Sequence, residues 1–175
     1  VDVFVSRGVI YDLQLIIGNE VSNGGVFSIT TDDSISAELR ALDANGNQWL
    51  IDGNWTYFHP EFADPSILSS NFSQEITFTP SLSSTTPYAI SVVHVEGDIT
   101  KSTNFMVYVS VGDIQNFEVT ALDSNGQYYA DVNMFRLTAD DSIDFAISTT
   151  DTNLNVVDDP QVSWLIKDMS TDMVE

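Results

Sequence analysis

Oxygen-bearing side chains recur two residues apart at three places in the sequence. They are Asp43-x-Asn45-x-Asn47, Asp151-x-Asn153-x-Asn155 and, in shorter form, Asp123-x-Asn125. Ligands at this spacing can wrap a calcium ion in a loop. An EF-hand loop needs glycine at its sixth position and glutamate at its twelfth, whereas Gly46 is fourth here and Asn54 is twelfth. We therefore favour an Asn-Gly hairpin turn and keep Asp43 and Asn45 as candidate calcium ligands.

Paired aspartates form a second candidate metal site. Asp32-Asp33 and Asp140-Asp141 lie just ahead of two strand-like runs, and adjacent carboxylates repel each other unless water or a cation neutralises them. A calcium ion at a junction between repeats could draw ligands from these pairs. Asx turns at the strand entry explain the same residues without metal. We favour the turns, expect no required cofactor, and keep Ca²⁺ as the alternative.

Groups suited to catalysis are few. The two histidines, His59 and His94, lack the spacing of a metal-binding motif, and the sequence has no Gly-x-Ser-x-Gly elbow and no phosphate-binding loop. The chain has no cysteine, which excludes thiol nucleophiles and Cys-ligated zinc. No pair of acids is singled out for glycoside hydrolysis. We expect a protein that is not an enzyme.

Two features could involve carbohydrate. The sequons Asn54-Trp55-Thr56 and Asn71-Phe72-Ser73 make Asn54 and Asn71 glycosylation candidates in a secreted protein, and Asn54 alternates to the exposed face of its run. Several aromatic side chains could stack on sugars, although packing in a core or between repeats accounts for most of them. These aromatics are Trp49, Tyr57, Phe58, Tyr128 and Tyr129.

Composition limits the partners. Among 175 residues, 26 are Asp or Glu and 5 are Lys or Arg, which gives a net charge of −21. Nucleic acids and anionic membranes are negatively charged and would be repelled. Binding of their phosphates needs clustered Lys and Arg, and the five cations here are scattered along the sequence. An acidic surface attracts cations instead. Apolar residues make up 43% of the chain, enough to bury a core.

Short alternating runs rich in Val, Ile, Thr, Phe and Tyr, separated by turn residues, predict an all-β protein of sandwich or barrel type. Turn signals such as Asn45-Gly46 and Asn125-Gly126 stand between the runs. The expected strands are Val1–Ser6, Tyr11–Ile17, Val26–Thr30, Ile35–Leu42, Gln48–Phe58, Glu75–Thr79, Tyr88–Val95, Asn104–Val109, Phe117–Leu122, Tyr128–Leu137, Ile143–Ser148 and Val162–Ile166.

The chain also repeats itself. The block Thr30–Ile35 returns as Thr138–Ile143, and the block Val3–Ile10 matches Val107–Ile114. The first match, carried forward, aligns Asp43 with Asp151 and, after one inserted residue, brings Trp55 onto Trp164. We predict that residues 1–7 close a preceding repeat, that 8–110 form a complete sandwich, and that 111–175 begin another, as in a window cut from a longer array.

The segment Leu39–Asn47, followed by Asp52, Trp55 and the run Tyr88–Val92, resembles the immunoglobulin-like (Ig-like) domains of bacterial and archaeal cell-surface proteins. The resemblance implies tandem antiparallel sandwiches of Greek-key type without the disulfide of antibody domains. It implies that Trp55 and Trp164 are buried, and that the Tyr88 hydroxyl ties the preceding corner.

We expect a non-enzymatic extracellular repeat module of an acidic surface protein, such as a stalk, an adhesin or a component of a surface lattice (S-layer). Its partners would be neighbouring repeats, cations and, in an adhesin, glycans or surface proteins, with no nucleic acid and no insertion into a membrane. The alternative is a carbohydrate-binding or accessory module of a secreted hydrolase or a viral fibre.

Overall fold

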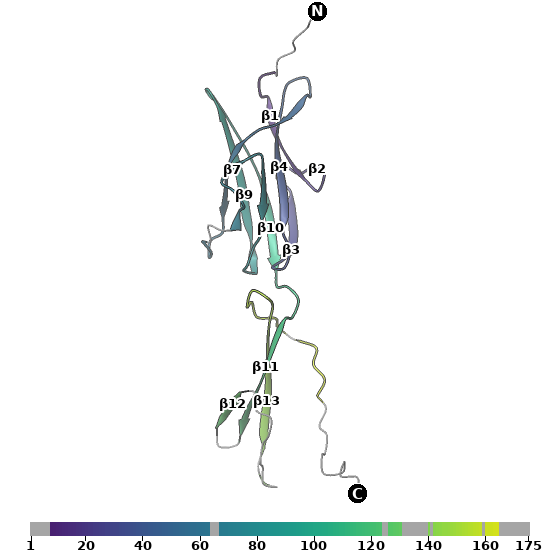
Figure 1. Ribbon diagram of the computed structural model, residues 1–175, viewed down its shortest axis with the longest axis vertical. Coiled ribbons are helices and arrows are strands. Elements are labelled where there is room, and N and C mark those ends of the chain that lie inside the picture. The colour runs from purple at the N-terminus through teal and green to yellow at the C-terminus, as the bar shows by residue number, and fades with distance from the viewer. Residues whose placement is uncertain are drawn as a thin grey trace, which may run out of the picture.

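The computed structural model describes residues 8–63, 67–123, 126–130, 140, 142–158 and 160–164 of the chain. Strands β1 to β13 in this part build three sheets, so the predicted all-β class is confirmed. None of the described residues belongs to a helix long and apolar enough to cross a membrane. Two sheets make an upper body and the third continues from it along the long axis (Figure 1).

The first sheet contains the strand that connects the two candidate aspartate loops. Its order is β2 (Glu20–Val21), β1 (Asp12–Ile17), β4 (Ile35–Leu42) and β5 (Gln48–Leu50), with β8 (Glu75–Phe78) also paired to β4. All these pairs are antiparallel. Because the first pair of aspartates precedes β4 and Asp43 follows it, the two loops lie at opposite ends of one strand.

The second sheet has the order β3 (Val26–Thr30), β10 (Ile99–Ser110), β9 (Ser84–Glu96), β6 (Gly53–Phe58) and β7 (Phe72–Ser73). Strand β3 runs parallel to β10, and the other pairs are antiparallel. The expected run Gln48–Phe58 is therefore two strands in different sheets. Gly53 lies at this crossing, where a side chain would collide with Leu39 and Val92.

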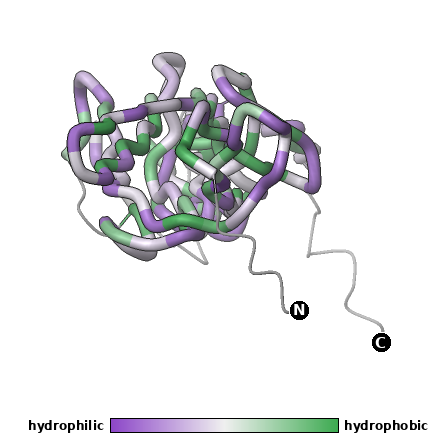
Figure 2. Tube along the Cα trace, turned by 90° about the horizontal axis from the view of Figure 1, so that it is seen from above, coloured by the Kyte–Doolittle hydropathy of each residue, from purple (hydrophilic) through white to green (hydrophobic). Residues whose placement is uncertain are grey.

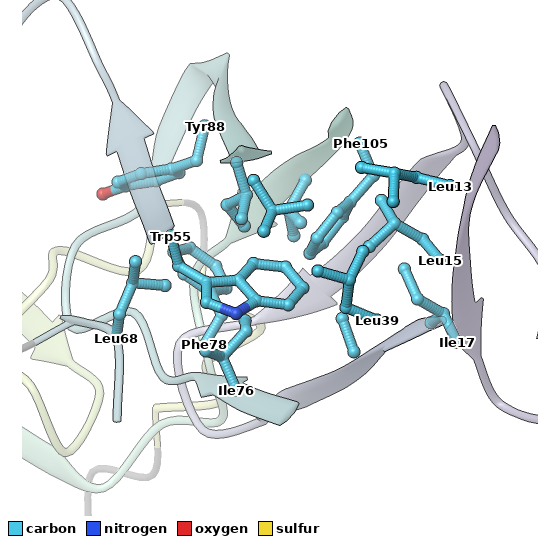
Figure 3. Packing of buried hydrophobic residues seen from close by; sticks show 14 of the residues in the cluster. Leu13, Leu15, Ile17, Leu39, Trp55, Leu68, Ile76, Phe78, Tyr88 and Phe105 are labelled. Carbon is cyan, nitrogen blue, oxygen red and sulfur yellow. The ribbon is translucent and has the colours of Figure 1, made fainter. Parts of the chain in front are cut away.

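The two sheets enclose one hydrophobic core (Figure 3). Leu13, Leu15 and Leu39 of the first sheet point toward Trp55 and Phe105 of the second, and each is at most 2% exposed. Burial of one such side chain contributes about 1.5–3 kcal/mol. Short hydrophobic and hydrophilic stretches alternate along the trace of the chain (Figure 2). The upper body is thus a β-sandwich.

Trp55 lies in this core as predicted, and Tyr88 lies in it as well. Trp55 is 2% exposed, and its indole Nε1 donates to the carbonyl of Ser73 at 2.9 Å. The Tyr88 hydroxyl donates to the carbonyl of Leu82 at 3.0 Å, six residues earlier in the chain. The expected tie between this tyrosine and the preceding corner is confirmed.

The third sheet repeats the pairing of the first. Its order is β12 (Tyr128–Ala130), β11 (Asn116–Asp123) and β13 (Ile143–Thr150). Phe117 stands opposite Thr149 in β11 and β13, just as Leu13 stands opposite Ala41 in β1 and β4. The sequence matches place these residues in equivalent positions, so the two pairs of strands have the same register.

Apolar side chains of the third sheet are much more exposed than their equivalents in the sandwich. Phe117 is 71% exposed where Leu13 is 1% exposed, and Trp164 is 55% exposed where Trp55 is 2% exposed. The prediction that Trp164 is buried is wrong. Its ring packs on Phe145 at a centroid distance of 5.6 Å, whereas Trp55 lies between two sheets.

The remaining strand predictions differ in outcome. The expected strand Val162–Ile166 is not formed over residues 162–164, which are the part of it that the structure describes. Val1–Ser6 and the run beyond Ala130 up to Leu137 lie outside the described residues. Strands β9 and β10 are longer than expected, because a hairpin at Gly97 (φ 59°) lets their pairing continue to the tip.

Candidate functional site

A loop that follows β13 carries Asp151, which organises its own turn. One carboxylate oxygen, Oδ1, accepts the backbone N–H groups of Asn153 at 2.8 Å and Asn155 at 2.9 Å. The backbone N–H of Leu154 donates to the carbonyl of Asp151, and Leu154 has a φ of 66°. The loop is therefore a hydrogen-bonded turn, and within it the second carboxylate oxygen, Oδ2, accepts the Asn155 amide at 2.9 Å.

That second oxygen meets the sandwich. The hydroxyl of Thr31, in the loop between β3 and β4, donates to Oδ2 of Asp151. The backbone N–H of Gly112 lies 2.9 Å from the Thr31 hydroxyl oxygen and 3.2 Å from the same carboxylate oxygen. Thr31 is 3% exposed and Asp151 is 0% exposed, so water is excluded from this contact.

Two amide side chains of the same loop extend the contact. Asn153 Nδ2 donates to the carbonyl of Thr31 at 2.9 Å, and Asn155 Nδ2 donates to the carbonyl of Ser81 at 2.9 Å. The backbone N–H of Ser83 donates to Oδ1 of Asn155 at 3.2 Å. We call this set of contacts the joint, and it consists of Thr31, Ser81, Ser83, Gly112, Asp151, Asn153 and Asn155.

The connection from β10 passes close beside the joint. A Cβ atom at Gly112 would collide with the carboxylate of Asp32, so the position accepts only glycine without a shift. The backbone N–H of the next residue, Asp113, donates to Oδ2 of Asp32 at 2.8 Å. Asp32 thus holds the connecting segment against the loop that carries Thr31.

Hydrogen bonding keeps the joint carboxylate charged. Burial opposes ionisation of Asp151, but the donors from the Thr31 hydroxyl and the Asn155 amide outweigh it and lower the pKa from 3.8 to about 2. Charge-assisted hydrogen bonds of this kind are stronger than neutral ones. The arrangement positions two bodies relative to each other.

Asp43, a candidate calcium ligand, heads a loop of the same design after β4. Its Oδ1 accepts the N–H groups of Asn45 at 2.8 Å and Asn47 at 2.9 Å. The Asn47 amide, which donates to Oδ2 at 2.8 Å, and the backbone N–H of Asn47 lower the pKa of Asp43. Asn45 contributes its backbone here, and the geometry is the turn favoured from the sequence.

The paired aspartates point to different partners. Asp33 Oδ2 accepts the backbone N–H of Thr30 at 3.1 Å and its hydroxyl at 2.8 Å, which lowers the pKa of Asp33, while Asp32 faces Gly112 and Asp113. Asp140 is exposed, and Asp141 lies outside the described residues. Within the described ranges, no three His, Asp or Glu side chains converge as metal ligands would.

The two glycosylation candidates lie together on one edge of the second sheet. Asn54 and Asn71 are both exposed, as expected for Asn54 from its alternation. The backbone N–H of Trp55 donates to the carbonyl of Asn71 at 2.8 Å, and Asn54 pairs with Phe72 across β6 and β7. An open hollow of about 690 Å³ adjoins them, lined partly by Tyr57, Phe58, His59 and Phe62.

The aromatic side chains considered for sugar stacking lie on more than one sheet. Trp49 lies on β5 of the first sheet and packs against the core, while Tyr57 and Phe58 are on β6 of the second sheet. Phe58 is 67% exposed. Tyr128 and Tyr129 lie on β12, and their side chains are not among those that the structure describes.

No protein-family model matches this chain, and no similar curated protein or solved structure was found. The relationship that informs the site is internal, because the loop of Asp151 repeats the loop of Asp43. Sequence reasoning missed Thr31, Ser81, Ser83 and Gly112 as members of the joint. Thr31 and Gly112 both lie inside repeated blocks, a signal that could have found them.

Proposed function

We propose that the chain is a non-enzymatic extracellular repeat module of an acidic surface protein, acting as a stalk, an adhesin or a lattice component. The observation that carries the proposal is the joint. Its side-chain and backbone hydrogen bonds fix one β-body at the end of another, which is what a protein that sets reach and stiffness requires.

The strand pairing supports the finer assignment to Ig-like sandwiches of Greek-key type. In a constant-type Ig domain the first, second, fourth and fifth strands share one sheet, and the third, sixth and seventh share the other. Here β1, β4 and β8 share one sheet while β6, β9 and β10 share the other, and β7, which lies between β6 and β8 in the chain, joins the second sheet. The parallel pairing of β3 with β10 closes the edge of the second sheet.

The acidic surface suits an extracellular role in salty surroundings. With a net charge of −21, the chain would hold a layer of hydrated cations and repel anions and other copies with the same charge. A lattice built from such units would admit small cations in preference to anions. Detection of the chain on intact source cells by a specific antibody would test the location.

Small-angle scattering on the full chain tests the mechanical role. We expect one extended shape for the wild type, and a broader distribution of shapes when Thr31→Val and Asp151→Asn are combined. A matched variant, Thr100→Val on the exposed face of β10, should leave the scattering unchanged. Equal flexibility of the wild type and the joint variant would overturn the proposal.

The hollow beside β6 favours one alternative, a carbohydrate-binding or accessory module. Tyr57, Phe58 and Phe62 offer apolar faces of the kind that stack on sugar rings, and Asn54 and Asn71 offer polar groups at the rim. A glycan array is the direct test. Binding that is lost with Tyr57→Ala would support this function, and absence of binding to any glycan would count against it.

A further inference from the structure

The loop of Asp43 reproduces the docked loop of Asp151 in detail. The N–H groups two and four residues after each aspartate lie 2.8 and 2.9 Å from its Oδ1 in both loops. Gly46 has a φ of 85° and Leu154, at the equivalent place, has a φ of 66°. In both loops Oδ2 also accepts the amide four residues later, at 2.8 Å from Asn47 and 2.9 Å from Asn155, so the turn that holds the carboxylate is the same in both.

The glycine beside the carboxylate is also repeated. Gly8 matches Gly112 in the sequence repeat, and a Cβ atom at Gly8 would come within 2.7 Å of Oδ2 of Asp43. In the joint, the N–H of Gly112 lies 3.2 Å from Oδ2 of Asp151. Each loop thus has a glycine backbone packed against the same carboxylate oxygen.

The two loops differ in what covers them. Asn153 and Asn155 are half-buried because the Thr31 and Ser81 carbonyls accept from their amides. Their equivalents Asn45 and Asn47 are exposed. The Asp43 loop has the groups that dock in the joint, and in the described part of the chain these groups do not meet a second body.

We propose that Gly8, Asp43, Asn45 and Asn47 form a second docking surface, and that its partner is the loop of a preceding repeat unit that corresponds to Thr30–Asp33 and carries a hydroxyl side chain at the position of Thr31. The inference rests on the proposed function. It assigns the partner by chemistry: a hydroxyl donor for the Asp43 carboxylate, and backbone carbonyls that accept from Asn45 and Asn47. A chain of units would then be fixed at successive joints of one design.

A unit of the same polypeptide fits this surface better than a second copy of the chain. The sequence Ser6-Arg7-Gly8 matches Ser110-Val111-Gly112, the short connection that brings one body to the next at the joint. In a second copy, the Thr31 loop is already occupied by Asp151. The block that repeats it later in the chain has Ala139 in place of Thr31 and lacks the hydroxyl.

The test adds a copy of residues 8–111 ahead of residues 8–175, so that Gly8 of the receiving unit follows Val111 as Gly112 does. The carboxyl pKa of Asp43 in the receiving unit is measured by carbon-13 NMR and compared with that in the unextended chain. We expect it to fall, because the docked carboxylate gains a hydroxyl donor. Thr31→Val in the added copy should reverse the fall, and Thr31→Ser should keep it.

The joint in the unextended chain is the control, where Thr31→Val should raise the pKa of Asp151. If that control responds while Asp43 ignores both the added unit and its Thr31→Val variant, the second docking surface is refuted and the proposed function stands. If the pKa of Asp151 also fails to respond, the joint itself is refuted. Protection of the Asn45 and Asn47 side-chain amides from hydrogen exchange gives a second readout in the same samples.

Discussion

The hydroxyl of Thr31 donates a hydrogen bond to the carboxylate of Asp151, which lies 120 residues later in the chain. Both groups are buried, and the contact joins the loop before β4 to the loop after β13. A donor and an acceptor so far apart in sequence can meet only when the two bodies hold one orientation. A measurement that detects this hydrogen bond therefore reports on the relative orientation of the two bodies.

Removal of the Thr31 hydroxyl should loosen the joint. Thr31→Val keeps the shape of the side chain but leaves a buried carboxylate oxygen without this donor, at a cost of about 1–3 kcal/mol. We expect faster hydrogen exchange at the backbone amides of Gly112, Asn153 and Asn155, with the core amides of β9 unchanged. Thr31→Ser, which retains the donor, should behave as the wild type does. Equal exchange in all three proteins would contradict the role of the hydroxyl.

The joint should open in acid. The pKa of Asp151 is lowered from 3.8 to about 2 in the docked state, in part by the Thr31 hydroxyl and the Gly112 N–H, which donate only when the joint is formed. The undocked loop keeps its Asn155 hydrogen bonds and loses these two donors, so its carboxyl pKa is higher and it binds more protons in acid. The stabilisation of the joint by Asp151 is thus complete at neutral pH and is lost as the pH falls toward 2. NMR shifts of the Gly112 amide would follow the opening. Asp151→Asn should remove this pH dependence, and a transition that persists in that variant would assign it to another group.

Much of the sandwich could be predicted because local patterns determine it. The run Ile35–Leu42 alternates from Ala37 onward between buried and half-buried positions and forms β4 with those bounds. The buried Trp55 and the Tyr88 hydroxyl bond also agree with expectation. Each of these features depends on residues close in sequence or on one face of a strand, where the period of the side chains carries the information.

The contacts of the joint depend on different physics. The sequence repeat predicts that Asp43 and Asp151 are equivalent, but it does not predict which loop of one body contacts which loop of the next. The position of Trp164 in the repeat likewise does not determine its burial. Trp55 is buried because a second sheet covers it, and Trp164 is 55% exposed. The break between β5 and β6 did have a local signal, the turn-type dipeptide Asp52-Gly53.

Loss of the Tyr88 hydroxyl should destabilise the sandwich without disturbing its core. Tyr88→Phe keeps the buried ring and removes the donor to the Leu82 carbonyl, which should cost about 1 kcal/mol in the free energy of unfolding. Urea denaturation followed by tryptophan fluorescence measures the change. Tyr108→Phe, at a side chain that is 42% exposed, is the matched control. The proposed tie would be rejected if the two variants were equally stable.

A methyl group at Gly53 should be costly because the core has no room for it. Its Cβ would collide with side-chain atoms of Leu39 and Val92, both fully buried, and overpacking of this kind costs about 1–3 kcal/mol. In a Leu39→Ala background, the cost of Gly53→Ala should shrink because one colliding group is gone. Unfolding measurements on the two single variants and the double variant give the coupling. Simple additivity would show that the strain at Gly53 has another origin.

Salt should stabilise the protein through screening, with no special effect of calcium. A net charge of −21 makes the folded chain repel itself, so sodium chloride should raise the melting temperature. Calcium chloride at matched ionic strength should add no saturable step, because Asp32, Asp33 and Asp43 already accept hydrogen bonds in separate turns. Calorimetric melting tests the effect of sodium chloride on the melting temperature. Calorimetric melting and isothermal titration with calcium chloride test for calcium binding. A saturable rise in melting temperature with measurable heat on calcium addition would restore the metal site at the paired aspartates, and Asp32→Asn compared with Asp140→Asn would then locate it.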